Sequence, residues 1–166
     1  MSTVNLTREA AQKKLKELFD TIGTGFLETN LGNKPSHAIP MSRKKVDDDG
    51  AIWFLSSKQS EHNKYIDNDN HVQLFYSQTS PKAHVTVFGT ASIITNPDML
   101  KELYHSDDDA WFNGLDDPNL TAIKVTPLHA HYWESKDGKI ATLFKMSLGA
   151  ITGNLQEIGV EGNLRP

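Results

Sequence analysis

Cysteine is missing from this chain of 166 residues, and so is any long hydrophobic run. The absence of cysteine excludes disulfides, thiolate catalysis and cysteine-ligated metal sites. No run is long enough to span a bilayer, and the first residues lack the charged-then-apolar layout of a secretory signal. With 17 Lys+Arg against 21 Asp+Glu, the formal net charge is -4, which disfavours a nucleic-acid binder. We therefore expect a cytoplasmic protein with neither membrane nor nucleic-acid partners.

Short hydrophobic segments separated by turn residues predict a mainly β fold. Gly89, in the middle of one such segment, indicates a β-bulge or a close backbone approach. Because only short turns separate most of the segments, they favour an antiparallel barrel decorated by helices. The six expected strands cover residues 25–29, 37–46, 51–57, 71–77, 85–94 and 121–133.

Amphipathic spacing predicts a helix of about four turns between Thr7, which can cap it, and Gly23. Shorter helices are expected at residues 61–67, from residue 96, and at 107–112. A further helix is expected at 140–151. The length suits one domain, which we place at residues 1–152, followed by an extended or loose tail at 153–166.

The turn after the third strand has the local chemistry of a phosphate site. Ser56, Ser57 and Lys58 follow a wholly apolar strand, and Ser60 can cap the next helix with Glu61 in its first turn. Hydroxyls, a cation and free backbone N–H groups at a helix N-terminus suit a bound phosphate. A capped helix after a core strand, with no ligand, explains the same residues.

Several segments together resemble the general stress proteins of the pyridoxamine 5′-phosphate oxidase-like group, which are FMN-binding split barrels. The resemblance runs nearly end to end and rests on the order and spacing of its segments. They are HAIPM at 37–41, the residues 50–66, VTVFGTA at 85–91, AWFNGLDDP at 110–118 and VTPLHAHYW at 125–133. The resemblance implies a six-stranded antiparallel split β-barrel with peripheral helices.

The resemblance also implies a homodimer with two FMN sites at its interface. In the family, the second strand runs along the flavin and the turn after the third strand holds its phosphate. Trp133 is implied as a wall of the pocket contributed across the interface, and His84 stands where related oxidases have a glutamine near the flavin. The cofactor-binding residues implied on the strand and the turn are Ile39, Pro40, Met41, Ser42, Leu55, Ser56, Ser57, Ser60, Glu61 and His62.

Two positions depart from the family pattern. Ile39 stands where an arginine is usual, and His62 where a lysine is usual. A charge-assisted contact to an anion contributes about 1.5–3 kcal/mol, so the loss of both cations predicts weaker FMN binding. The nearby cations that could compensate are Arg43, Lys44, Lys58 and Lys64.

The remaining polar and aromatic clusters have weaker interpretations. Trp111 and Phe112 line a substrate pocket or belong to the core or a dimer interface. His129, His131 and Glu134 can bind a metal or are surface residues of a barrel strand. The aspartates at 47–49 and 107–109 lack the spacing of a calcium loop, and we interpret them as solvated turn and helix-start residues.

The leading hypothesis is an FMN-binding general stress protein that acts as a flavin-dependent oxidoreductase on a small molecule. A non-catalytic flavin-binding or sensing protein is the alternative, and a metal-binding barrel is a third. Pyridoxamine phosphate oxidase activity itself is not expected, because the substrate-binding Arg and His-rich segment of that enzyme has no counterpart after Trp133.

Overall fold

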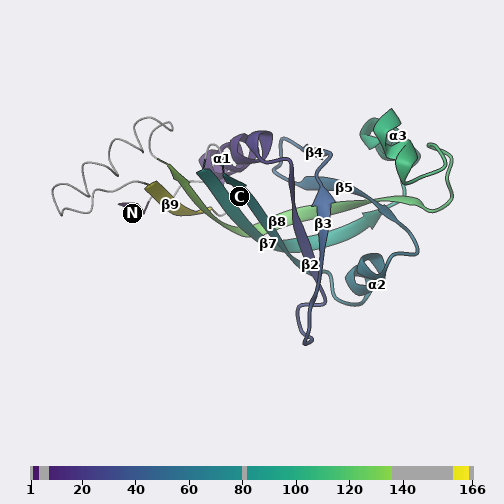
Figure 1. The fold of residues 1–166 in the computed structure, drawn as a ribbon, viewed down its shortest axis with the longest axis horizontal. Helices are drawn as coiled ribbons and strands as arrows, with labels where there is room; N and C mark the ends of the chain where they lie inside the picture. The colour runs from purple at the N-terminus through teal and green to yellow at the C-terminus, as the bar shows by residue number, and fades with distance from the viewer. Residues whose placement is uncertain (1, 4–7, 80–81, 136–158, 165–166) are drawn as a thin grey trace.

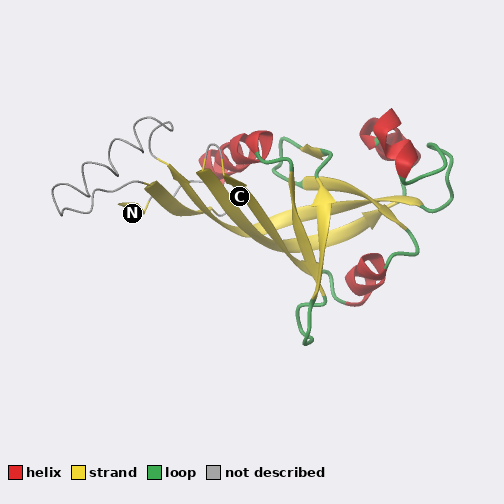
Figure 2. Cartoon of the chain, in the orientation of Figure 1, coloured by secondary structure: helices red, strands yellow, loops and turns green. Residues whose placement is uncertain are grey.

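One curved, mainly antiparallel sheet with helices packed against it forms the fold (Figures 1 and 2). The computed structural model describes residues 2–3, 8–79, 82–135 and 159–164. The helix expected at 140–151 and the cap expected from Thr7 lie outside the described residues. The mainly β barrel fold predicted from the sequence is confirmed.

Six main strands correspond to the six that the sequence predicts. They are β2 (Thr24–Thr29), β3 (His37–Ser42), β5 (Ile52–Ser57), β6 (His71–Thr79), β7 (Lys82–Ile94) and β8 (Leu120–Ser135). Three shorter strands complete the sheet: β1 (Ser2–Thr3), β4 (Lys45–Val46) and β9 (Gly159–Leu164). Strand β9 lies within the predicted tail and pairs with the end of β8.

The single strand expected at 37–46 is wrong, because the chain changes partner within it. Strand β3 pairs antiparallel with β2 and ends at Ser42. Two residues later the backbone N–H of Lys44 donates to the carbonyl of Trp53 at 2.8 Å, and β4 pairs with β5. The switch carries the chain from one wall of the barrel to the other.

Strand β8 joins the two walls. One of its edges pairs with β7 along nearly its whole length, while the other pairs first with β5 and then with β9. The sheet order from β8 is β7, β6, β2 and β3, so β3 is the last strand of this path among the described residues. Strands β3 and β5 therefore face each other across a split, and the candidate site lies there.

The predicted irregularity at Gly89 is confirmed. The register of β7 with β8 shifts between Phe88 and Gly89, opposite Pro127. A Cβ atom on Gly89 would lie 2.3 Å from the carbonyl oxygen of Thr126, so only glycine allows this approach. The bulge lets two long strands bend around the core.

In the described part of the chain, three α-helices and one short 3-10 helix pack against the sheet: α1 (Arg8–Thr21), α2 (Glu61–Asn68), α3 (Pro97–Leu103) and η1 (Ser106–Ala110). The apolar face of α1 packs on the main core, where Phe19 meets Tyr76 edge-on with ring centroids 4.6 Å apart. A second core cluster joins Trp53 to Leu100 and Leu103 of α3. No helix among the described residues is long and apolar enough to cross a membrane.

Candidate functional site

A cavity of about 440 Å³ lies at the split between β3 and β5. Ten residues predicted as cofactor or substrate contacts line it, and three more join them. The predicted residues are Ile39, Pro40, Met41, Ser42, Leu55, Ser56, Ser57, His62, Trp111 and Phe112. The three others are Arg43, Lys44 and Asp108.

Ser60 and Glu61, also predicted as cofactor contacts, do not line this cavity. The Ser60 hydroxyl accepts from the backbone N–H of Asn63 at 3.3 Å and caps helix α2. Glu61 is exposed, with one carboxylate oxygen 4.0 Å from Nδ1 of His37. Their positions fit a structural role at the helix start, which orients the residues on either side of it.

The hydroxyl groups of Ser56 and Ser57 differ in how many hydrogen bonds they make within the protein. Ser56 is buried, and its hydroxyl lies 2.8 Å from the hydroxyl of Thr121, which also accepts from the Asn63 amide at 3.0 Å. The Ser57 hydroxyl accepts only a long 3.4 Å bond from the backbone N–H of Gln59 among the contacts of the described residues. Ser57 is therefore the hydroxyl of the turn that is best able to bind a ligand.

His62 is a neutral side chain with an unused nitrogen. Burial, and then the nearby His37, lower its pKa from 6.5 to about 4, so the ring carries no charge at neutral pH. Its Nε2 is buried and has no hydrogen-bond partner within the described structure. Buried polar atoms are nearly always bonded, so this nitrogen suits a ligand that bonds to it.

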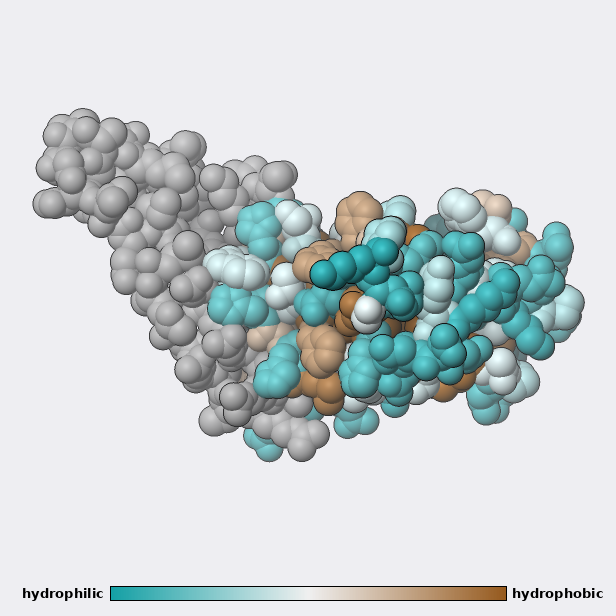
Figure 3. Space-filling view, turned by 90° about the horizontal axis from the view of Figure 1, so that it is seen from below, coloured by the Kyte–Doolittle hydropathy of each residue, from teal (hydrophilic) through white to brown (hydrophobic). Residues whose placement is uncertain are grey.

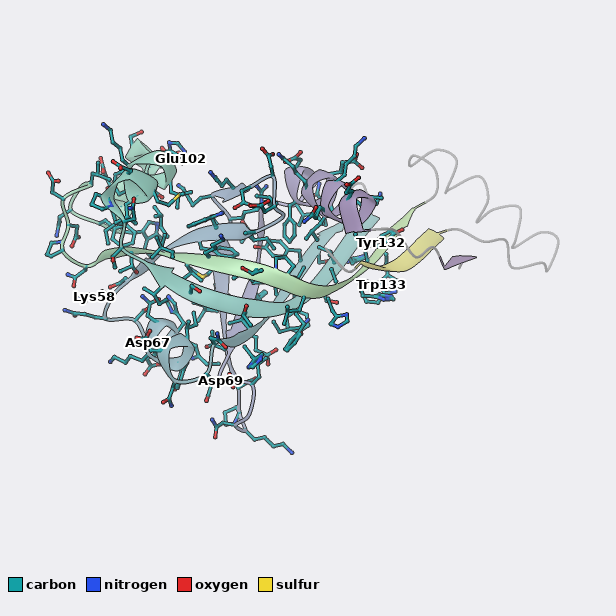
Figure 4. All side chains as sticks on the ribbon, turned by 180° about the vertical axis from the view of Figure 1, so that it is seen from behind. Lys58, Asp67, Asp69, Glu102, Tyr132 and Trp133 are labelled. Atoms are coloured by element: carbon teal, nitrogen blue, oxygen red, sulfur yellow. The ribbon has the colours of Figure 1, made fainter. Side chains whose placement is uncertain are left out.

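Of the four cations considered as replacements for the usual arginine and lysine, Arg43 and Lys44 line the cavity. Arg43 donates through Nη2 to the carbonyl of Phe19, and its Nε is buried without a partner in the described part of the chain. Lys58 and Lys64 are exposed and not among the lining residues, and Figure 4 shows the Lys58 side chain extending away from the body of the protein. The cavity thus gains cations from the β3–β4 connection.

The aspartates at 107–109 lie at the start of η1, as expected, but Asp108 is not solvated. Its carboxylate accepts from Lys44 Nζ at 2.7 and 2.9 Å, and the two side chains are only 14% and 15% exposed. Asp107 and Asp109 are exposed as expected. No local pattern separates the three aspartates, so sequence reasoning missed a contact between residues 64 positions apart.

The segment that carries Trp111 and Phe112 is fixed by side-chain bonds to the backbone and to each other. The Tyr104 hydroxyl donates to Asp109 at 2.6 Å, which raises the pKa of Tyr104 to about 12. Asp117 accepts from the backbone N–H groups of Asn113 and Asn119, and these bonds lower its pKa. Phe112 packs on the second core cluster, while Trp111 is 83% exposed beside the cavity.

His84 and Trp133, the other two predicted cofactor contacts, lie away from this cavity. They are cross-strand partners on β7 and β8, and His84 Nδ1 lies 2.8 Å from the Ser77 hydroxyl. In Figure 4, Trp133 lies at the opposite end of the sheet from Lys58. His84 lines a second hollow of about 320 Å³, and Pro40 lines both hollows.

The metal alternative gains no support from the geometry. Among the described residues, no group of three or more His, Cys, Asp or Glu side chains is placed to hold a metal ion. His129 is exposed, and the His131 ring lies against Trp133 with centroids 4.3 Å apart. The side chain of Glu134 lies outside the described residues.

Comparison with known proteins identifies the family. The family model for pyridoxamine 5′-phosphate oxidase-like proteins matches residues 10–157. The chain belongs to this family. General stress protein 26 of Bacillus subtilis is 26% identical over 125 residues, which are 74% of this chain and 87% of that protein. Protein bli-3 of Neurospora crassa is 29% identical over 115 residues, 63% of this chain and only 55% of its own length.

Solved structures of the family share the fold. A general stress protein 26 from Jannaschia sp. CCS1 superposes with a TM-score of 0.79 at 22% identity, over 96% of this chain and 100% of that one. A general stress FMN/FAD binding protein from Xanthomonas citri has a TM-score of 0.65 at 26% identity, over 80% of this chain and 93% of that one. The split barrel is therefore the architecture of this chain and of its relatives.

Proposed function

We propose that the cavity between β3 and β5 binds a flavin, specifically FMN, with its phosphate at the turn that carries Ser57 and His62. The main support is that two buried nitrogens of cavity residues, Arg43 Nε and His62 Nε2, have no hydrogen-bond partner in the described structure. Such atoms favour a ligand that hydrogen-bonds to them. The relative from Xanthomonas citri, 26% identical, is an FMN/FAD binding protein by name.

The residues present suit such a ligand. A cavity of about 440 Å³ falls within the range of about 300–1,000 Å³ that small-molecule sites occupy. Ile39, Met41 and Leu55 offer apolar contacts to a planar ring, while Ser57 and the nitrogens of His62 and Arg43 offer polar ones. Because His62 is neutral and Ile39 is apolar, these two residues bind a phosphate less strongly than cations would.

A bound flavin would supply hydride and electron transfer, while the chain binds it, orients it and limits the access of water. We therefore propose a flavin-dependent oxidoreductase that acts on a small molecule. Trp111, beside the cavity and exposed, offers a surface on which a planar substrate can stack.

A protein that holds flavin without turnover is the second candidate. It is favoured by the engagement of both cavity cations, since Arg43 donates to a backbone carbonyl and Lys44 to Asp108. Reduction of the bound flavin by a nicotinamide cofactor, followed at the flavin absorbance band, distinguishes the two. Steady turnover with any physiological donor would exclude the second candidate.

The proposed functional unit is a homodimer. Phe26 on β2 and Phe75 on β6 are cross-strand partners, and their side chains are 52% and 42% exposed. Both line the second hollow together with His84. Figure 3 shows hydrophobic side chains reaching the surface between hydrophilic ones on the face seen from below. A second copy on the hollow would also lie against Pro40, which borders the flavin cavity.

Titration with FMN tests the cofactor claim. We expect saturable quenching of flavin fluorescence by the wild-type protein and its loss in L55W, because the larger ring fills the cavity. L128W is the matched control, since Leu128 is exposed and is not among the lining residues. No saturable change with the wild type, or equal binding by L55W with its fold intact, would refute the proposal.

A further inference from the structure

The cavity has two chemically different ends. One end carries Ser57 and His62, at the turn after β5. The other carries Lys44 and Asp108, with Trp111 and Phe112 on the same segment as Asp108. The backbone N–H of Lys44 donates to the carbonyl of Trp53, and about 13 Å of extended strand separates Trp53 from Ser57 along β5.

The second end is electrically balanced although it contains a lysine. Both carboxylate oxygens of Asp108 accept from Lys44 Nζ, at 2.9 and 2.7 Å, and one also accepts from the backbone N–H of His105 at 2.8 Å. The pair is mostly buried, with 15% and 14% of the side chains exposed. Lys44 is therefore committed to an internal partner, and Asp108 is held firmly against it.

Arg43, the other cation of the cavity, keeps its positive charge, and its hydrogen-bond partner lies on a different element. Its guanidinium donates to the carbonyl of Phe19 and lies 5.9 Å from the Phe19 ring centroid, so it is directed toward helix α1. An anion that entered beside Lys44 would have to lie near the Asp108 carboxylate and compete with it. Like charges placed together in a partly buried site disfavour binding and select against the wrong ligand.

We propose that this end of the cavity accepts a small planar molecule without net charge, and that Asp108 excludes phosphate esters and other anions from it. The inference rests on the proposed flavin function, because it assigns the second end to the molecule that binds beside the flavin. Trp111 and Phe112 supply the aromatic surface, and Asp108 determines the charge that is allowed. The phosphate ester in the family's name, pyridoxamine 5′-phosphate, is thus the kind of ligand that this chain rejects.

Titration of flavin-loaded protein with pyridoxine and pyridoxine 5′-phosphate tests the charge preference, because the two differ only in the phosphate. Calorimetry measures each affinity. Wild-type protein should bind pyridoxine at least as tightly as its phosphate ester. D108N should bind the ester about tenfold more tightly than the wild type does, equivalent to about 1.4 kcal/mol, and bind pyridoxine unchanged.

Two further variants make the result specific. D107N changes the same charge one residue away, at an exposed position outside the cavity, and should behave as the wild type. Adding K44M to D108N should remove the gained affinity, because the freed lysine is the group that holds the ester. The asparagine retains an acceptor for the His105 N–H, so the local turn is preserved.

The outcomes separate this inference from the proposed function. A wild-type protein that prefers the phosphate ester, or a D108N variant that gains no more than D107N does, overturns the role of Asp108. A protein that takes up no flavin refutes the flavin site instead. In that case the titrations with pyridoxine and pyridoxine 5′-phosphate are run on protein without flavin. If D108N then binds the ester no more tightly than the wild type does, the role of Asp108 is overturned there too.

Discussion

A single proton at His62 changes the charge of the cavity. The pKa of this ring lies at about 4 in the folded protein and at 6.5 in an unperturbed histidine. As the pH falls through 6.5, the unfolded chain binds a proton that the folded chain does not, so folding is favoured less. The stability contribution of neutral His62 is complete above pH 6.5 and declines between pH 6.5 and about pH 4.

We predict that H62Q reduces this pH dependence of stability. Between about pH 7.5 and pH 4.5, the free energy of unfolding of the wild type should fall by about 1–2 kcal/mol more than that of H62Q, a value reduced for the partial solvation of the ring. Urea unfolding at both pH values measures the difference. Parallel loss of stability in both proteins would show that His62 is not the titrating group.

Ser57 and Ser60 lie on one turn but have separate roles. We predict that S57A weakens FMN binding about tenfold with little change in stability, because Ser57 lines the cavity and its hydroxyl accepts only a long internal bond among the described residues. S60A should lower the free energy of unfolding by about 1 kcal/mol and leave FMN affinity unchanged, because its hydroxyl caps α2. Fluorescence titration and urea unfolding of both variants measure the two effects. Weaker FMN binding by S60A would contradict the assignment of separate roles to Ser57 and Ser60.

Among the strands, the pairing of β7 with β8 depends most on Gly89, at the register shift where β8 carries one extra residue. We predict that G89A lowers the free energy of unfolding by about 2–3 kcal/mol, because the added methyl would meet the Thr126 carbonyl at 2.3 Å. G23A is the control, since nothing lies within 4 Å of its Cβ position, and it should change stability by less than about 0.5 kcal/mol. Equal effects of the two substitutions in thermal unfolding would refute the close approach.

Elements that are marked by a residue in their own segment, such as a capping serine or a glycine, could be predicted from the sequence. Helix α2 begins at Glu61, after the cap that Ser60 was expected to provide, and the bulge at Gly89 follows from a glycine within an apolar strand. The break between Ser42 and Lys45 could not be predicted, because it arises when the backbone leaves β2 and joins β5. Changes of partner within an extended segment leave no trace in its own hydrophobic pattern.

Across the molecule, the site could be predicted from the sequence only in part, because some of its contacts join distant segments. The residues of β3 and the turn after β5 were expected at the site through the family resemblance, and the fold brings most of them to one cavity. The pairing of Lys44 with Asp108 joins segments 64 residues apart, and the bond from Arg43 to Phe19 spans 24. Such contacts depend on how the barrel closes, which local composition does not specify.

The distance between Trp133 and the cavity bears on the proposed assembly. On β8, Ser57 pairs with Leu120, and Trp133 follows thirteen residues later, up to about 43 Å along the strand. Trp133 of the same chain therefore lies far from the Ser57 end of the cavity. A contribution of Trp133 to the flavin site, as the family resemblance implies, requires a second copy of the chain.

We predict that F75D weakens dimerisation at least about 100-fold, because it introduces a charge into an apolar surface that the second copy would bury. L115D is the matched control, since Leu115 is similarly exposed, at 38%, and does not line the second hollow. Sedimentation velocity over a range of concentrations measures the assembly, and circular dichroism checks that both variants fold. If the dimer forms through this face, F75D should also bind FMN more weakly than L115D, because Pro40 borders both hollows. A wild type that stays monomeric at high concentration, or an F75D that assembles as L115D does, would contradict a second copy on this face.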